Sequence, residues 1–266
     1  MNVMSQTQTY AGPWLAWAFI AMIGLAAPIA AMLVHSNELT PAPQSLVTGS
    51  ILAVGLMGTA MISAAATGRF WVGVLLALLG SAGLVALALV LGMASLSQPI
   101  AALLAIAVAS ASFAARGALF ARSASAKGWW IAVCVVAGEA AVVVTAAIDP
   151  NLWPDWALAL LPAQWATMAI QSALAGAPAA SSALIALAGT ALATGLVVQL
   201  WPSRWPYLIM FTAWLGCAAL VYHRPGPPIL DELHNTSLVA EEGHKQMAYP
   251  FDLHCFFALS PRKYPQ

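Results

Sequence analysis

Charged side chains are scarce in this sequence of 266 residues. Only 7% of the residues are charged, nine Lys or Arg balance nine Asp or Glu, and 62% are hydrophobic. A soluble globular domain has about 25% charged residues and roughly 45–50% apolar ones. So few charges cannot solvate a water-facing surface, and a nucleic-acid-binding protein would need a basic excess. The composition excludes these classes and predicts an integral membrane protein.

The sequence also lacks the short motifs of common enzymes. It contains no GxxxxGK[ST] loop, no HExxH, no GxSxG, no CxxC, and no aspartate-rich pair to hold Mg²⁺ against a diphosphate. No histidine lies within a predicted span, and the three cysteines (Cys134, Cys217 and Cys255) are far apart in sequence. We therefore expect no disulfide, no metal, no cofactor and no catalytic residue, although residues from separate helices can still build a membrane enzyme.

Long apolar runs fill most of the chain. About 20 apolar residues cross roughly 30 Å of hydrocarbon, and continuous rather than alternating runs favour helices over barrel strands. We predict an all-α, polytopic integral membrane helix bundle with about eight transmembrane helices. The predicted spans are 14–34, 46–66, 70–91, 96–115, 129–148, 156–175, 180–200 and 205–222. The sixth contains Pro162, which removes a backbone donor and kinks a helix.

The distribution of Lys and Arg predicts the orientation. The division is a short N-terminal segment (1–13), the helix bundle (14–222) and a C-terminal tail (223–266). With eight spans, the segments on the side of the N-terminus hold eight basic residues and the other side holds only Arg204. The eight are Arg69, Arg116, Arg122, Lys127, Arg224, Lys245, Arg262 and Lys263. We predict that both termini and the tail are cytoplasmic; without the sixth span the count becomes five against four. Short loops and alanine-rich spans favour a bacterial inner membrane.

Glu139 is the outstanding candidate functional residue. It follows Trp129 by ten residues and precedes Ile148 by nine, which places it roughly 15 Å from either end of its span. No Lys, Arg or Asp lies at matching depth in another predicted span, so we expect a protonated, hydrogen-bonded carboxyl. Two interpretations stay open: a proton-coupled or substrate-binding carboxyl, or a neutral hydrogen bond between helices.

Two polar helix faces could meet Glu139 in a weakly polar cavity. Gln164, Thr167 and Gln171 share one face of the sixth predicted span because they are three and four residues apart. The other candidates are Thr59, Ser63 and Thr67 on the second span and Thr145 on the fifth. For these hydroxyls and amides we favour ordinary hydrogen bonds between helices over a binding role.

Three function classes fit the sequence. The first is a non-catalytic subunit or assembly factor of a larger membrane complex, whose partners are membrane lipids and other membrane subunits or further copies of itself, but no nucleic acid. Nearly featureless spans and an apolar tail end (Phe251, Leu253, Phe256, Phe257 and Leu259) favour it. The second, ranked close behind, is a small-solute transporter or exporter with Glu139 as its intramembrane polar centre. The third is a membrane enzyme acting on a lipid.

Overall fold

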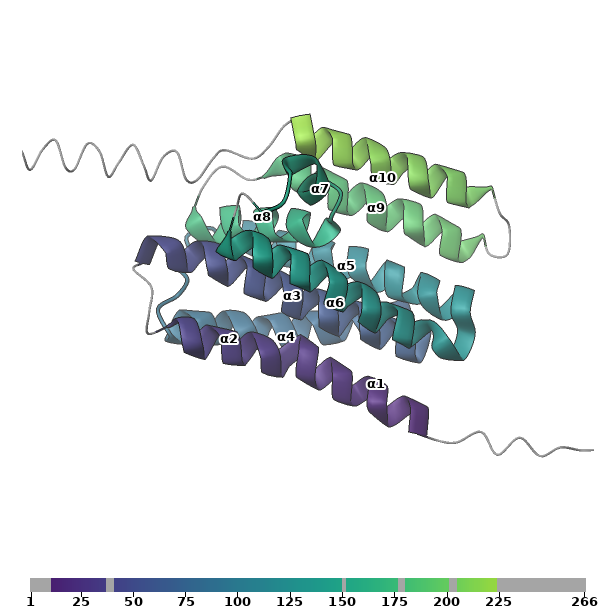
Figure 1. Ribbon diagram of the computed structural model, residues 1–266, viewed down its shortest axis with the longest axis horizontal. Coiled ribbons are helices and arrows are strands. Elements are labelled where there is room, and N and C mark those ends of the chain that lie inside the picture. The colour runs from purple at the N-terminus through teal and green to yellow at the C-terminus, as the bar shows by residue number, and fades with distance from the viewer. Residues whose placement is uncertain (1–10, 37–40, 150–151, 177–179, 201–204, 224–266) are drawn as a thin grey trace, which may run out of the picture. The chain divides into compact units, whose positions relative to one another are not determined.

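The computed structural model describes residues 11–36, 41–149, 152–176, 180–200 and 205–223. These residues form an all-α helix bundle without strands (Figure 1), which confirms the predicted fold class. Within them, six segments are long and apolar enough to cross a membrane. One of the six, Pro99–Ile148, comprises two helices that run in opposite directions, so the described residues offer seven candidate spans, and the predicted count of eight is not confirmed.

The helices follow one another with short connections. Their bounds are α1 (Ala11–Ala21), the π-helical turn η1 (Met22–Ala26), α2 (Ala27–His35), α3 (Pro41–Thr67), α4 (Phe70–Val90), α5 (Pro99–Ala124), the 3₁₀ turn η2 (Ser125–Lys127), α6 (Gly128–Ile148), α7 (Asp155–Ala159), α8 (Pro162–Ala175), α9 (Ser181–Gln199) and α10 (Pro206–His223). The first three of these elements form one span, and η1 is the point where its hydrogen-bond ladder widens.

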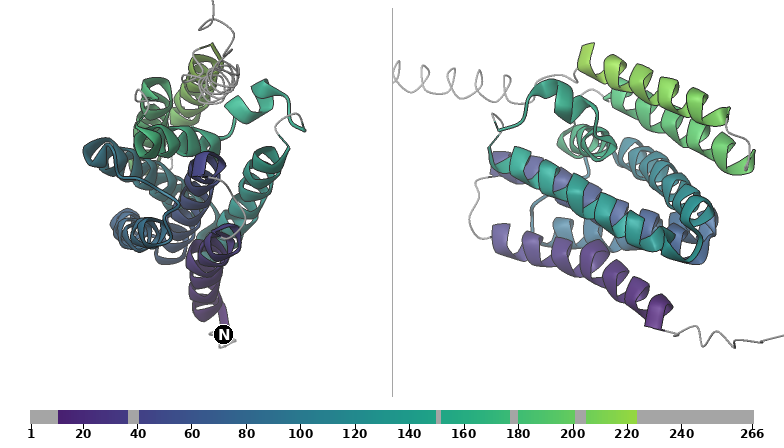
Figure 2. Two further views of the ribbon diagram at one scale, coloured as in Figure 1. Left: turned by 90° about the vertical axis from the view of Figure 1, so that its left-hand side faces the viewer. Right: turned by 45° about the vertical axis from the view of Figure 1, so that its right-hand side comes forward.

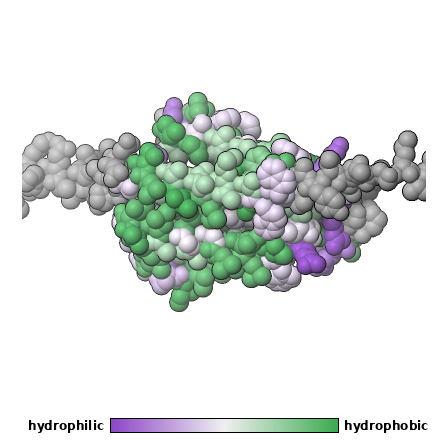
Figure 3. Space-filling model, turned by 90° about the horizontal axis from the view of Figure 1, so that it is seen from below, coloured by the Kyte–Doolittle hydropathy of each residue, from purple (hydrophilic) through white to green (hydrophobic). Residues whose placement is uncertain are grey.

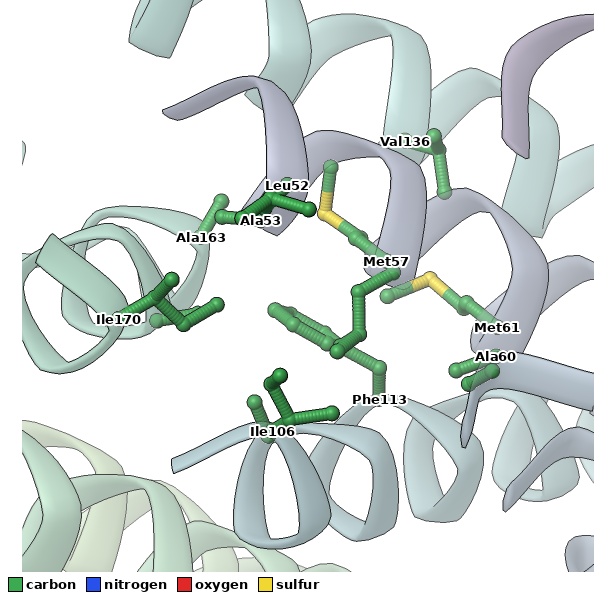
Figure 4. Close-up of a cluster of buried hydrophobic side chains, with 14 of the residues drawn as sticks. Leu52, Ala53, Met57, Ala60, Met61, Ile106, Phe113, Val136, Ala163 and Ile170 are labelled. Carbon is green, nitrogen blue, oxygen red and sulfur yellow. The ribbon is translucent and has the colours of Figure 1, made fainter. Parts of the chain in front are cut away.

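Helix α3 lies at the centre of the bundle and is its most deeply buried span. It packs against α4, α5, α6 and α8. Figure 4 shows the core that results, with Met57 and Met61 of α3 beside Phe113 of α5 and Val136 of α6. Apolar side chains also cover most of the face seen in Figure 3. An interior and an exterior that are both apolar are what a helix bundle surrounded by lipid requires.

The predicted sixth span is not one helix. The chain leaves helical geometry at Leu161, and Pro162 begins α8, as proline is suited to do in a first helical turn. With 14 residues, α8 is roughly 21 Å long, which is too short to cross about 30 Å of hydrocarbon. In Figure 2 α8 is seen nearly end-on in the view where the long helices run across, so it is also inclined to them.

The end of α8 lies beside the segment that joins α4 to α5. The hydroxyls of Ser95 and Ser97 donate to the carbonyl of Leu174 at 3.3 and 3.2 Å, and Gln98 Nε2 donates to the carbonyl of Gly176 at 3.1 Å. The α4–α5 connection and the end of α6 lie at the same end of the bundle (Figure 1). Helices α7 and α8 therefore form a re-entrant hairpin, which enters the bundle and returns to the end from which it came.

Because the hairpin returns to the end from which it came, α9 and α10 run in the opposite directions to those predicted. Helix α9 starts at the end where α6 stopped, and α10 returns there, so α10 ends opposite the start of α1 (Figures 1 and 2). The start of α1 and the end of α10 therefore lie at opposite ends of the bundle, and the prediction that both termini lie on one face, which counted the hairpin as a crossing, is not confirmed. The predicted tail, apart from His223 at the end of α10, lies outside the described residues.

Candidate functional site

Arg116 lies inside a helix and not in a loop. The predicted span ended at residue 115, whereas α5 continues to Ala124, so Arg116 is eight residues, or roughly 12 Å, from its end. Glu139 is eleven residues, or roughly 17 Å, from the start of α6 at Gly128. Because the short turn η2 joins these helices, the two charged groups lie at similar depth. The expectation that no cation matches the depth of Glu139 is wrong.

Glu139 caps the first turn of α8 from a neighbouring helix. Its Oε2 accepts a hydrogen bond from the backbone N–H of Ala163 at 3.1 Å. The first N–H groups of a helix have no acceptor within it and carry the positive end of its dipole. Leu161, at the N-cap of α8, supplies no side-chain acceptor. The carboxyl thus fixes the start of α8, and the hydrogen bond between helices has a backbone amide as its donor.

The guanidinium of Arg116 attracts Glu139 through its charge without forming its hydrogen bond. It lies over the ring of Phe113, with Cζ 5.6 Å from the ring centroid. Within the described part of the chain it has neither a hydrogen-bond acceptor nor a direct salt bridge, and no fully buried side-chain nitrogen or oxygen lacks a partner there. Its N–H groups are therefore not completely enclosed by packed protein.

Arg116 and Glu139 both line a cavity of about 230 Å³. Its wall combines α5 and α6 on one side with α9 and α10 on the other. The remaining lining residues are mostly apolar: Leu119, Phe120, Val135, Pro162, Thr190, Thr194, Met210, Phe211 and Trp214. The hydroxyl of Thr190 is engaged with the carbonyl of Ala186 at 2.9 Å and with Ser112 at 3.2 Å. The lining of the cavity is thus almost wholly apolar, and Arg116 and Glu139 are the two ionisable residues within it.

The other predicted site residues lie elsewhere. Glu139 lines the cavity, whereas Gln164, Thr167 and Gln171 are absent from its described lining. Gln164 is half-buried, and buried Thr167 donates to the carbonyl of Ala163 at 3.0 Å. Gln171 packs against Gly49 of α3, where its Cγ fills the place of a side chain. The structure therefore joins the start of α8, and not its polar face, to Glu139.

The hydroxyls of α3 and α6 also make contacts away from Glu139. Thr59 donates to the carbonyl of Gly55 at 2.9 Å, Ser63 donates to the carbonyl of Thr59, and Thr67 to that of Ser63 at 2.8 Å. Thr145 accepts a hydrogen bond from Trp153 Nε1 at 2.9 Å. These groups satisfy their own backbone or hold the segment after α6, and the weakly polar cavity predicted around them is not what surrounds Glu139.

Sequence reasoning missed Arg116, although a signal for it exists. The residues after it, Gly117 to Ala121, are all small or apolar and suit a continuing membrane helix. The prediction ended this span just before Arg116, because Arg116 is charged, and so assigned Arg116 to a loop.

No family model, no curated protein and no solved structure matches this chain. Its class is defined by the helices themselves, as an all-α membrane-type bundle with a re-entrant hairpin and a charged cavity.

Proposed function

We propose that this chain is a small-solute transporter of a bacterial inner membrane, with the cavity of Arg116 and Glu139 as its binding site. The observation that carries the proposal is that two ionisable residues, Arg116 and Glu139, line one cavity in the middle of apolar helices without forming a direct salt bridge with each other. Ionisable groups within a membrane span are costly, and they mark substrate and ion pathways. Binding of a ligand in this cavity would explain why the bundle contains two ionisable residues despite the free-energy cost of placing them in a membrane.

The hairpin of α7 and α8 supports the same function. Non-helical backbone at membrane depth is tolerated where protein buries it or where it lines a cavity. Transporters place the ends of broken helices at their binding sites, where the helix N-terminus contributes positive charge. Here the start of α8 lies at Glu139, and Pro162 lines the cavity.

Water access to the cavity tests the transporter proposal. Thr194 lines the cavity, whereas Leu192, two residues away on α9, is 76% exposed on the outer surface. Each is changed to Cys in a chain whose native Cys134, Cys217 and Cys255 are replaced by Ala. We expect Thr194→Cys to react with a charged, membrane-impermeant thiosulfonate reagent in membranes, and Leu192→Cys, which faces lipid, to remain unmodified. If Thr194→Cys reacts no faster than Leu192→Cys, the cavity is dry and the transporter proposal fails.

The alternative of a non-catalytic subunit or assembly factor stays a prediction with its own test. A mild-detergent pull-down of the tagged chain from native membranes would recover stoichiometric partner chains if it is correct. Recovery of the chain alone, together with labelling of Thr194→Cys, would favour the transporter.

A further inference from the structure

We infer that the cavity binds a small zwitterion with an apolar body, of the kind represented by an α-amino acid with an apolar side chain. This inference rests on the proposed function and names its substrate class. Its basis is the pairing, within one cavity, of an unsatisfied guanidinium, a carboxyl and apolar walls.

The two charges define the polar end of the ligand. The Arg116 N–H groups have no acceptor among the described residues, and a guanidinium binds a carboxylate by two parallel hydrogen bonds. Glu139 uses Oε2 for Ala163, which leaves Oε1 to accept from a ligand ammonium. A ligand with both charges close together satisfies both groups and adds no net charge to the membrane interior.

The same pairing disfavours ligands of one charge. An anion alone would meet Arg116 but would lie close to the carboxyl of Glu139, and a cation alone would have the opposite problem. In a weakly polar site such a like-charge contact is costly, because little water screens it. The charge pair therefore selects for a zwitterion over either of its singly charged analogues.

The apolar walls of the cavity indicate an apolar ligand body, and the cavity volume limits the size of the ligand. Phe120, Phe211 and Trp214 offer aromatic surface, and Leu119, Val135 and Met210 offer aliphatic surface. A hydroxylated or charged ligand body would lose water there and gain few hydrogen bonds. The volume of about 230 Å³ is below the roughly 300–1,000 Å³ of pockets for drug-sized ligands, so the ligand is small.

Competition binding to the full-length purified chain in nanodiscs tests the inference. The probe is radiolabelled L-phenylalanine. Its competitors are 3-phenylpropionate, which lacks the ammonium, phenethylamine, which lacks the carboxylate, and L-glutamate, which lacks the apolar side chain. On the wild-type chain we expect L-phenylalanine to bind at least about tenfold more tightly than each of the three, since a hydrogen bond to a charged group is worth that factor or more. No binding of L-phenylalanine, or equal competition by a singly charged analogue, would overturn the inference.

Two variants test which residue binds which charged group of the ligand. In Glu139→Gln, which keeps an oxygen for the Ala163 amide, we expect the preference over 3-phenylpropionate to disappear while that over phenethylamine remains. In Arg116→Gln we expect the reverse. A merely structural role for either residue would weaken all ligands in parallel, and that result would contradict the assignment. If Thr194→Cys is labelled by the water-soluble reagent but L-phenylalanine does not bind, the transporter proposal stands and the zwitterion inference alone fails.

Discussion

Placing Arg116 or Glu139 within a membrane helix costs free energy, and each residue partly offsets the cost of the other. A charged side chain at the centre of a membrane helix costs about 2.5–3.5 kcal/mol on insertion scales. In this bundle the two charges attract each other, and the carboxyl also caps α8. Removing one charge leaves the other without its counter-charge, and removing both does not.

A double-mutant cycle measures this dependence. We expect Arg116→Gln and Glu139→Gln each to lower the unfolding temperature in detergent, and the double variant to be more stable than the sum of the two losses predicts. The coupling free energy should lie at about 0.5–3 kcal/mol, as for other groups that share one interaction network. Additive losses would show that the two groups act independently.

Two glycines beside the charged residues provide a matched test of packing. A Cβ on Gly117, next to Arg116, would lie 2.2 Å from the backbone oxygen of Met61 in α3. Gly138, next to Glu139, has nothing within 4 Å of such a Cβ. We expect Gly117→Ala to destabilise the fold by about 1–3 kcal/mol through overpacking, and Gly138→Ala to change stability by less than about 1 kcal/mol.

Thermal unfolding of both glycine variants in the same detergent makes this comparison. A Gly117→Ala chain as stable as Gly138→Ala would show that α5 does not need its close approach to α3, and hence that this contact does not position Arg116.

At the scale of the element, the sequence predicts where a helix is interrupted better than where the chain goes next. Pro162 within an apolar run indicated a break, and the break is found there. The return of α8 depends on contacts distant in sequence, from Ser95, Ser97 and Gln98 to the end of α8 and from Glu139 to its start. Hydropathy measures composition along the chain, so it cannot distinguish a kinked span from a hairpin of the same length.

Labelling the two ends of the hairpin tests its re-entrant path. Leu152, before α7, and Ala175, at the end of α8, are both exposed, and Ser123 is exposed at the opposite end of the bundle. In the cysteine-free chain we expect Leu152→Cys and Ala175→Cys to react with an impermeant reagent applied from one side, and Ser123→Cys to react only from the other. Labelling of Leu152→Cys and Ala175→Cys from opposite sides would restore the sixth predicted span.

At the scale of the whole molecule, one short hairpin reverses the direction in which α9 and α10 run compared with the eight-span prediction. Composition alone predicts the all-α membrane bundle, and the ends of most helices fall close to the predicted spans. The number of candidate spans depends on a single segment, however: with α7–α8 as a hairpin it is seven, where eight were predicted. A separate error placed Arg116 among the loop charges, because the predicted span ended at residue 115 whereas α5 continues to Ala124.

With seven crossings the loop charges give a new orientation. If each candidate span crosses, the sequence positions of Arg69, Arg122, Lys127 and Arg204 assign them to the side on which α1 starts, and the position of Arg224 assigns it to the other side. The next basic residue of the tail, Lys245, is 22 residues after His223, beyond the range of about 15–20 residues in which positive charges set orientation. Four charges against one therefore predict a cytoplasmic N-terminus and a segment after α10 on the opposite face.

Reporter fusions to the full-length chain in a bacterial host decide this orientation. We expect green fluorescent protein fused before Met1 to fluoresce, because it matures in the cytoplasm, and alkaline phosphatase fused after Gln266 to be active, because it matures only outside. Exchanging the two reporters should abolish both signals while the chain is still detected in the membrane by immunoblot. An inactive phosphatase together with a fluorescent C-terminal fusion would place both termini in the cytoplasm and require an even number of crossings. The same result would contradict the topology of seven crossings and, with it, the re-entrant path of α7 and α8 that supports the proposed binding site.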